Sequence, residues 1–259
     1  MLGVQVSETA SFPYFDPPKP RLFAHRGLAQ HAGLDENTIP AFLAALEHGA
    51  THLESDTQAT ADDVAVLFHD EDLNRVAGID AKVRELSLSE IKSLRLQNGG
   101  EIPTLTEALE ALPSARFNLD IKTKPAITPT ISAIEALEAH DRVLVSSFSN
   151  PIRKSALRDL SKPIATSGSL STVVAAWLSH RFLFGLGFAA IVRHVHAFQV
   201  PVSRGPIKFA TKGFIGRAQR HQTELHFWTI NDPAEMRRLI ALGADGIVSD
   251  RVDLYEAGK

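Results

Sequence analysis

Three short motifs in the first third of the chain combine residue types that handle protons, anions and hard cations. They are His25-Arg26-Gly27, the pair Glu54 and Asp56, and His69-Asp70, all within 46 residues. Histidines exchange protons near neutral pH, arginine binds anions, and paired carboxylates bind hard divalent cations. Hydrolysis of a phosphodiester needs all three functions in one place. The motifs therefore predict a metal-dependent phosphodiesterase.

Each motif also has a plainer interpretation. A solitary histidine after a strand is commonly a surface or capping residue, and Glu54 and Asp56 could form the solvent face of an edge strand. An Asp-x-Lys pair such as Asp120 and Lys122 is commonly a surface ion pair that contributes little. Their joint placement at strand ends favours a functional site. The other nine histidines are interpreted as structural or surface residues.

Short extended runs alternate with helical patterns and predict a parallel sheet with crossover helices. The extended runs are 21–24, 51–56, 64–68, 116–121, 142–147, 163–165, 197–200, 224–230 and 246–249. The helical segments are 39–48, with Asn37 as its expected N-cap, and then 105–112, 128–139, 151–160, 208–221 and 233–242. No GxGxxG motif follows the first run and no Walker loop is present, so we expect an α/β fold closed into a (β/α)8 TIM barrel.

The length of 259 residues suits one barrel domain. We expect residues 1–20, with prolines at 17, 18 and 20 near their end, to be an N-terminal lead segment, and residues 21–259 to be the barrel. The polar stretch 83–102 interrupts the alternation. It predicts a small insertion, about residues 70–103, after the second strand.

Active sites of TIM barrels lie at the C-terminal ends of the strands. The side chains predicted at that end are His25, Arg26, Glu54, Asp56, His69, Asp120, Lys122, Phe148 and Trp228. Phe148 and Trp228 are core residues by default and also candidates for lining a substrate pocket. Gly27 is expected to let the backbone turn close to the substrate.

The spacing of the carboxylates favours a bound cation. Glu54 and Asp56 are two residues apart on a strand, so both point to the same side and repel each other unless a cation lies between them. With oxygen ligands and no cysteine in the chain, Mg²⁺, Ca²⁺ or Mn²⁺ is favoured over zinc. Asp120 and Lys122 show the same spacing, so that one can complete the metal shell while the other meets phosphate.

Composition excludes several other classes. A net charge of −3 and a pI near 6.4 give no basic surface that would favour nucleic acid. The absence of cysteine excludes disulfides, thiolate metal sites and a cysteine nucleophile. The first residues lack the pattern of a signal peptide, and the apolar stretch 182–192 (FLFGLGFAAIV), flanked by Arg181 and Arg193, is too short to span a bilayer. A cytoplasmic location is expected.

The sequence resembles the glycerophosphodiester phosphodiesterase family. The matching segments, in the family's order, are AHRG (24–27), ENTIPAF (36–42), GATHLESD (49–56), VLFHDEDLNR (66–75), IPTLTEAL (102–109), FNLDIK (117–122), VLVSSF (143–148), FWTIND (227–232) and GADGIVSD (243–250). The resemblance implies a TIM barrel with an insertion after its second strand. It implies that His25 and His69 are the general acid–base pair. One divalent cation, Mg²⁺ or Ca²⁺ with Mn²⁺ as a further candidate, would lie on Glu54, Asp56 and Asp120, with Arg26 and Lys122 on the phosphate.

Two features depart from the family's pattern. The third cation ligand is often glutamate, and Asp120 is shorter by one methylene, so its contact is expected to be long or through water. The stretch 171–196 looks expanded and more apolar than a minimal member needs. The implied reaction releases glycerol 3-phosphate and an alcohol. His25 is expected to act as base and His69 as acid, and the nucleophile is either water or the substrate's glycerol 2-hydroxyl.

Two alternative functions stay open from the sequence. The stretch 182–192 at a pocket rim could accept an acyl chain or touch a membrane, which would make the chain a lysophospholipase D; its plainer interpretation is a barrel helix buried against the sheet. The second alternative is a catalytically silent barrel with a binding role. The intact set of His25, His69, Glu54 and Asp56 counts against that alternative.

Overall fold

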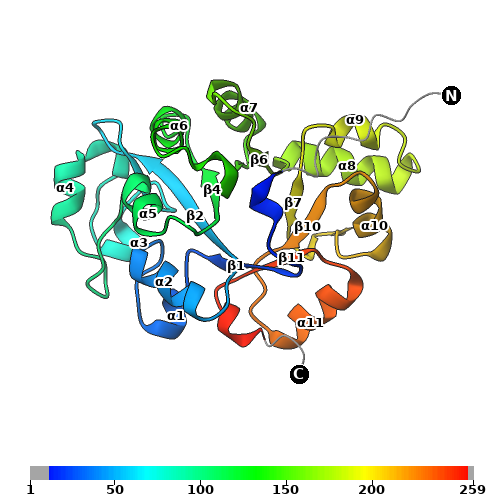
Figure 1. Ribbon diagram of the computed structural model, residues 1–259, viewed down its shortest axis with the longest axis horizontal. Helices are drawn as coiled ribbons and strands as arrows, with labels where there is room; N and C mark the ends of the chain where they lie inside the picture. Colours follow the sequence, from blue (N-terminus) through cyan, green and yellow to red (C-terminus); the bar gives the residue numbers. More distant parts are fainter. Residues whose placement is uncertain (1–11, 256–259) are drawn as a thin grey trace.

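Eight parallel strands form the centre of the structure, a computed structural model that describes residues 12–255 (Figure 1). Their order around the sheet is β6-β5-β4-β2-β1-β11-β10-β7. A parallel bridge between Ser167 and Ala197 joins the two ends of this order, next to β6 and β7. The predicted TIM barrel is therefore confirmed. The strands are β1 (Arg21–His25), β2 (His52–Ala59), β4 (Phe117–Ile121), β5 (Val143–Ser146), β6 (Ala165–Thr166), β7 (Ala197–Val200), β10 (Glu224–Phe227) and β11 (Gly246–Ser249).

Helices surround the strands, and α2, α5, α10 and α11 begin at residues whose side chains accept hydrogen bonds from the first turn. Thr38, Thr104, Thr211 and Asp232 each satisfy one backbone N–H that the helix itself leaves unpaired. The helices outside the insertion are α1 (Ala29–Ala32), α2 (Ile39–Glu47), α5 (Leu105–Ala111), α6 (Ile127–Ala136), α7 (Asn150–Asp159), α8 (Leu170–Phe182), α9 (Phe188–Val192), α10 (Lys212–Arg220) and α11 (Pro233–Leu242). In the described part of the chain, none of the helices combines the length and the apolar character that crossing a bilayer requires.

Two sequence expectations about the order of elements are wrong. The run 64–68 is not a barrel strand, because β3 (Ala65–Leu67) pairs antiparallel with the far end of β2 and lies off the barrel path. The segment 208–221 is helical only from Lys212, since residues 203–208 form a small hairpin of β8 (Ser203–Arg204) and β9 (Ile207–Lys208). A short apolar run fits either type of element, so periodicity alone does not separate them.

The segment expected as an insertion forms a small lobe beside the barrel, coloured cyan in Figure 1. It contains α3 (Asn74–Ala77), the 3-10 turn η3 (Val83–Glu85) and α4 (Leu88–Ser93). It has a hydrophobic cluster of its own, separate from the main core: Val66, Phe68, Leu73, Val83, Ile91, Leu96 and Ile102. The lobe therefore holds its shape through its own buried side chains.

Residues 12–20 pack against the N-terminal ends of the strands and close that end of the barrel. Tyr14, on the 3-10 turn η2 (Pro13–Phe15), is fully buried. Arg116 Nε donates to the carbonyl oxygen of Pro13 at 3.2 Å. The strand residues that cluster with Tyr14 are Phe23, Leu144, Ala165, Ala197 and Val248. This part of the lead segment is thus built into the barrel core.

This packing shifts the pKa of His52, the first residue of β2. Its ring lies between Tyr14 and Phe23, with ring centroids 4.7 Å from each. Nε2 lies 3.0 Å from the Tyr14 carbonyl oxygen and Nδ1 lies 2.9 Å from Thr51 Oγ1, so both nitrogens of the neutral ring are satisfied. Burial lowers the pKa of His52 from its usual 6.5 to about 3.

This depressed pKa predicts a loss of stability on acidification. The unfolded chain takes up a proton at His52 below pH 6.5, whereas the folded chain does not until about pH 3, so stability is complete above pH 6.5 and falls as the pH drops. Between pH 7 and 5 the cost is about 2 kcal/mol. Urea unfolding of the wild type and of His52→Gln, whose amide can still donate to Tyr14, measures it. Equal pH sensitivity in the two proteins would contradict the assignment.

Candidate active site

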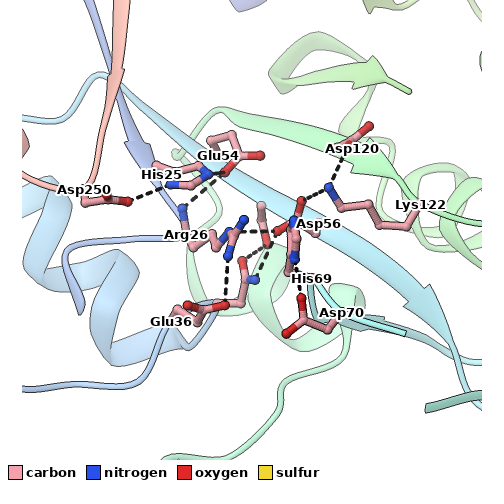
Figure 2. Close-up of polar contacts among 12 residues, drawn as sticks. His25, Arg26, Glu36, Glu54, Asp56, His69, Asp70, Asp120, Lys122 and Asp250 are labelled. Atoms are coloured by element: carbon pink, nitrogen blue, oxygen red, sulfur yellow. Dashed lines mark hydrogen bonds and ion pairs between the residues drawn. The ribbon is translucent and has the colours of Figure 1, made fainter. Parts of the chain in front are cut away.

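A cavity of about 860 Å³ opens at the C-terminal ends of the barrel strands. All nine side chains that the sequence places at this end line it: His25, Arg26, Glu54, Asp56, His69, Asp120, Lys122, Phe148 and Trp228. Figure 2 shows the polar part, in which residues from β1, β2 and β4 converge. The fold therefore brings the expected set together, while the role of each residue stays a prediction.

The two histidines have the same arrangement. His25 Nδ1 lies 2.6 Å from Asp250 Oδ1, and His69 Nδ1 lies 2.6 Å from Asp70 Oδ1 (Figure 2). A carboxylate beside Nδ1 favours the tautomer that carries its proton there. In both rings Nε2 is then left to act on a bound molecule, which is the arrangement that acid–base catalysis needs.

The partner of His25 is a residue that the sequence analysis did not single out. Asp250 follows β11 directly, so the strand-end argument that located the other groups could also have found it. Burial disfavours the charged imidazole, but the bond to Asp250 and the charge of Glu54 outweigh it and raise the pKa of His25. His25 Nε2 lies 3.9 Å from Glu54 Oε2.

Arg26 is held in an unusual backbone conformation. Its φ is +57°, a left-handed value that non-glycine residues rarely adopt and that is found at functional sites. Its Nη1 donates to Glu36 Oε1 at 3.1 Å, and its Nε lies 3.3 Å from Asp56 Oδ2. The guanidinium is therefore fixed at the cavity by two carboxylates.

The structure gives a different reason for the glycine at position 27 from the expected approach to the substrate. Its φ is +84°, and a Cβ atom placed there would lie 2.8 Å from the backbone carbonyl carbon of Ala41. The close approach is therefore to helix α2, and Gly27 is not among the residues that line the cavity. Glycine lets the chain turn sharply after β1 and sets Arg26 at the rim.

Asn37 also has a different role from the predicted one. The N-cap of α2 is Thr38, whose side chain accepts from the backbone N–H of Ala41. Asn37 Nδ2 instead donates to Asp56 Oδ2 at 3.3 Å, and its Oδ1 accepts from Ser55 Oγ at 2.7 Å. The sequence places Asn and Thr side by side, and only the structure shows that the asparagine orients a carboxylate.

The three carboxylates expected to bind a cation lie on adjacent strands. Asp56 on β2 pairs in register with Asp120 on β4. Glu54 lies two residues before Asp56 on β2, so that its side chain is on the same face of the strand. Burial, together with the charge of Asp56, raises the pKa of Glu54 to about 7. Burial also raises the pKa of Asp120, whereas Lys122 and Arg26 overcome burial and lower the pKa of Asp56.

The ammonium of Lys122 lies between two of these carboxylates. Its Nζ is 2.7 Å from Asp56 Oδ1 and 2.7 Å from Asp120 Oδ2 (Figure 2). Consequently, among residues 12–255 no three acidic or histidine side chains are arranged as a preformed metal site. The donor chemistry nevertheless fits a hard cation, since three buried carboxylates line one cavity and Glu54 has no ion pair with a lysine or arginine of the described residues.

Another part of the cavity wall is made largely of apolar side chains. Phe148 and Trp228 meet edge to face with ring centroids 6.0 Å apart, and Lys122 Nζ lies 5.9 Å from the Phe148 ring centroid. The further apolar lining residues are Leu170, Val173, Val174, Val200, Ile207 and Phe209. A phosphate bound at the charged end would thus have its substituent beside apolar walls.

The stretch 182–192 does not border this cavity, so the alternative in which it forms part of the pocket rim is wrong. It begins at the last residue of α8, whereas Leu170, the first residue of that helix, lines the cavity. At 1.5 Å per residue the two ends are about 18 Å apart. Only Phe188 and Val192 of the stretch are buried, so the interpretation as a fully packed barrel helix also fails for residues 182–186.

A TIM barrel with histidines, cationic side chains and carboxylates around one cavity is typical of enzymes that hydrolyse phosphate esters. The chain belongs to the Glycerophosphoryl diester phosphodiesterase family, whose sequence model matches residues 25–254. Its activity is accordingly that of a glycerophosphodiester phosphodiesterase.

Individual relatives agree with this family assignment. The chain is 37% identical over 232 residues to a probable glycerophosphodiester phosphodiesterase 2 of Mycobacterium tuberculosis, covering 89% of this chain and 87% of the relative. It is 24% identical to a lysophospholipase D of Homo sapiens, over 83% of this chain and 79% of that protein. A crystal structure of a glycerophosphodiester phosphodiesterase from Thermotoga maritima matches with a TM-score of 0.70 and 25% identity, over 90% of this chain and 95% of that one.

Proposed function

We propose that the chain hydrolyses glycerophosphodiesters with His25 and His69 as its general acid–base pair, aided by one divalent cation. The observation that supports this most is the shared arrangement of the two histidines, each with Nδ1 2.6 Å from an aspartate and each lining the same cavity. Two rings presented alike to one cavity suit the removal and the delivery of a proton.

In the proposed reaction His25 Nε2 removes a proton from the attacking oxygen, which belongs to water or to the glycerol 2-hydroxyl. The new P–O bond forms as the bond to the alcohol breaks, and the electron pair stays with the leaving oxygen. His69, protonated on both nitrogens at the start, donates its Nε2 proton to that oxygen, while Asp70 balances its charge. With water as the ultimate nucleophile, the products are glycerol 3-phosphate and the free alcohol.

Arg26 and Lys122 are the cationic side chains proposed to bind the phosphate. Glu54, Asp56 and Asp120 would hold the cation, which when bound would neutralise negative charge on the phosphoryl oxygens. Lys122 contacts two of these carboxylates, and its flexible side chain can turn from them toward the phosphate. Preorganised positive charge of this kind is usually the largest single contribution to catalysis.

A second candidate is lysophospholipase D activity at the same site. The apolar part of the cavity wall favours this activity, because it could contact an acyl chain. A small water-soluble diester does not need such apolar contacts. The similarity to a human lysophospholipase D supports the same reading. The family membership and the intact histidines support an active enzyme over a silent barrel.

One assay tests both candidates. The purified chain with Mg²⁺ or Ca²⁺ is given glycerophosphocholine and, separately, lysophosphatidylcholine, and the phosphorus products are identified by NMR. We expect glycerol 3-phosphate from the first substrate. Lysophosphatidic acid from the second would add the lysophospholipase D activity, and its absence would remove that candidate. No cleavage of either diester with cation present would contradict the proposed function.

A further inference from the structure

The large apolar side chains that remain exposed are gathered on one side of the molecule. Within residues 12–255 eight such side chains are exposed. Six of them lie on α8 or in the turn between α8 and α9, and a seventh, Phe148, lies next to the start of α8, where its carbonyl oxygen accepts from Leu170 N. Phe184 is 93% exposed and Leu186 is 78% exposed. The seven are Phe148, Leu170, Leu178, Phe182, Leu183, Phe184 and Leu186, and the eighth is Leu43 on α2.

Helix α8 is apolar on two faces, which explains the pattern. Val173 and Ala176 are buried against the barrel. Leu170, Leu178 and Phe182, spaced by multiples of four, lie together on the outward face. An apolar stripe therefore runs along α8 from the cavity, which Leu170 lines, to the α8–α9 turn at the outer edge of the molecule (Figure 1). We call residues 182–186 the apolar tip.

The same part of the chain is strongly basic. Between Asp159 and Glu224 lie eight of the 27 lysines and arginines and none of the 30 aspartates and glutamates. The net charge of −3 hides this asymmetry. None of these eight side chains forms an ion pair with a carboxylate of residues 12–255. They are Lys162, Arg181, Arg193, Arg204, Lys208, Lys212, Arg217 and Arg220.

Two of the arginines are in direct contact with the apolar tip. The Arg181 guanidinium lies 5.3 Å from the ring centroid of Phe182. The Arg217 guanidinium lies against the tip backbone, where a Cβ on Gly185 would be 1.4 Å from its Nη1. Arg217 Nε also donates to His180 Nδ1 at 3.0 Å. Cationic groups thus surround exposed aromatic and leucine side chains.

We propose that this face docks the enzyme on an anionic lipid surface. The apolar tip would enter the headgroup region, and the surrounding arginines and lysines would contact lipid phosphates. Docking along α8 would hold the cavity mouth, at the other end of the helix, next to the membrane. A second copy of the chain is disfavoured as the partner, because residues 160–223 of each copy would bring like charge together and have no carboxylate of their own to pair with it.

Binding to vesicles tests the proposal. The full chain is sedimented with phosphatidylcholine vesicles that either contain or lack phosphatidylglycerol. We expect binding to the anionic vesicles and little to the neutral ones, with a marked loss at high salt. The double variant Phe184→Ser/Leu186→Ser should lower the partition coefficient by roughly tenfold or more, because two large apolar side chains no longer leave water. Arg181→Glu/Arg193→Glu should lower it as well.

Leu43→Ser, at the one exposed large apolar residue elsewhere in residues 12–255, is the matched control and should bind as the wild type does. Turnover of soluble glycerophosphocholine by each variant shows that the barrel is intact. Unchanged vesicle binding by the tip variant, or equal binding to neutral vesicles, would overturn the proposal. So would a wild-type dimer in sedimentation velocity that the tip substitutions dissociate.

Discussion

Replacing either His25 or His69 with alanine should lower turnover of a glycerophosphodiester by at least about 10²–10⁴-fold. Each ring is held at the cavity by one aspartate through Nδ1, so alanine removes the Nε2 that is proposed to move a proton. Both rings are partly exposed at the cavity, so the variants should stay folded and bind substrate. Steady-state kinetics and circular dichroism of the two variants are the measurements. Near-normal kcat in either variant would contradict the assignment.

The control is His48→Ala, which removes an exposed histidine outside the cavity and should leave kcat unchanged.

The variant Asp250→Asn tests whether His25 acts as the base or as the acid. Since Asp250 helps raise the pKa of His25, its removal should lower that pKa. If His25 is the base, the acidic limb of the pH profile moves to lower pH. Movement of the alkaline limb instead would assign His25 as the acid.

Chelation with EDTA should abolish turnover, and Mg²⁺ or Ca²⁺ should restore it. The three carboxylates that would hold the cation are buried, and the cation would balance charge that Lys122 only partly offsets. Added cation should also raise the melting temperature of the wild type, because it binds the folded chain only. Full activity in EDTA would contradict the cation proposal without touching the histidine assignment.

The same cation should bind less tightly in acid. Without the cation the pKa of Glu54 is raised to about 7, so at lower pH the cation competes with a proton. Apparent affinity should fall by up to about tenfold for each pH unit below 7, measured by isothermal titration calorimetry. Glu54→Gln should bind weakly at every pH. Asp120→Glu, which restores the missing methylene, should bind more tightly than the wild type.

The catalytic end of the barrel could be predicted from the sequence because its residues are local in the chain. The extended runs that place His25, Glu54 and Asp56 at strand ends can be recognised from neighbouring residues alone, although β2 continues to Ala59. The barrel itself followed from the alternation of elements.

What the sequence could not show are contacts between distant residues. Asp250 lies 225 positions from His25, and nothing in the spacing pairs them. The sequence also did not show that the Lys122 ammonium lies between Asp56 and Asp120. Opposite charges buried close together attract each other, and their arrangement depends on the pairing of β2 with β4. Likewise, the outward apolar face of α8 resembles a buried one until the neighbours are known.

The closure of the barrel floor by Tyr14 has a practical consequence for cutting the chain. The family match begins at residue 25, the last residue of β1, and excludes both that strand and the turn beneath it. A fragment trimmed to the match would expose Phe23's neighbours, including His52, to water. Expression fragments should therefore begin no later than residue 12, so that they keep Tyr14 and the whole of β1.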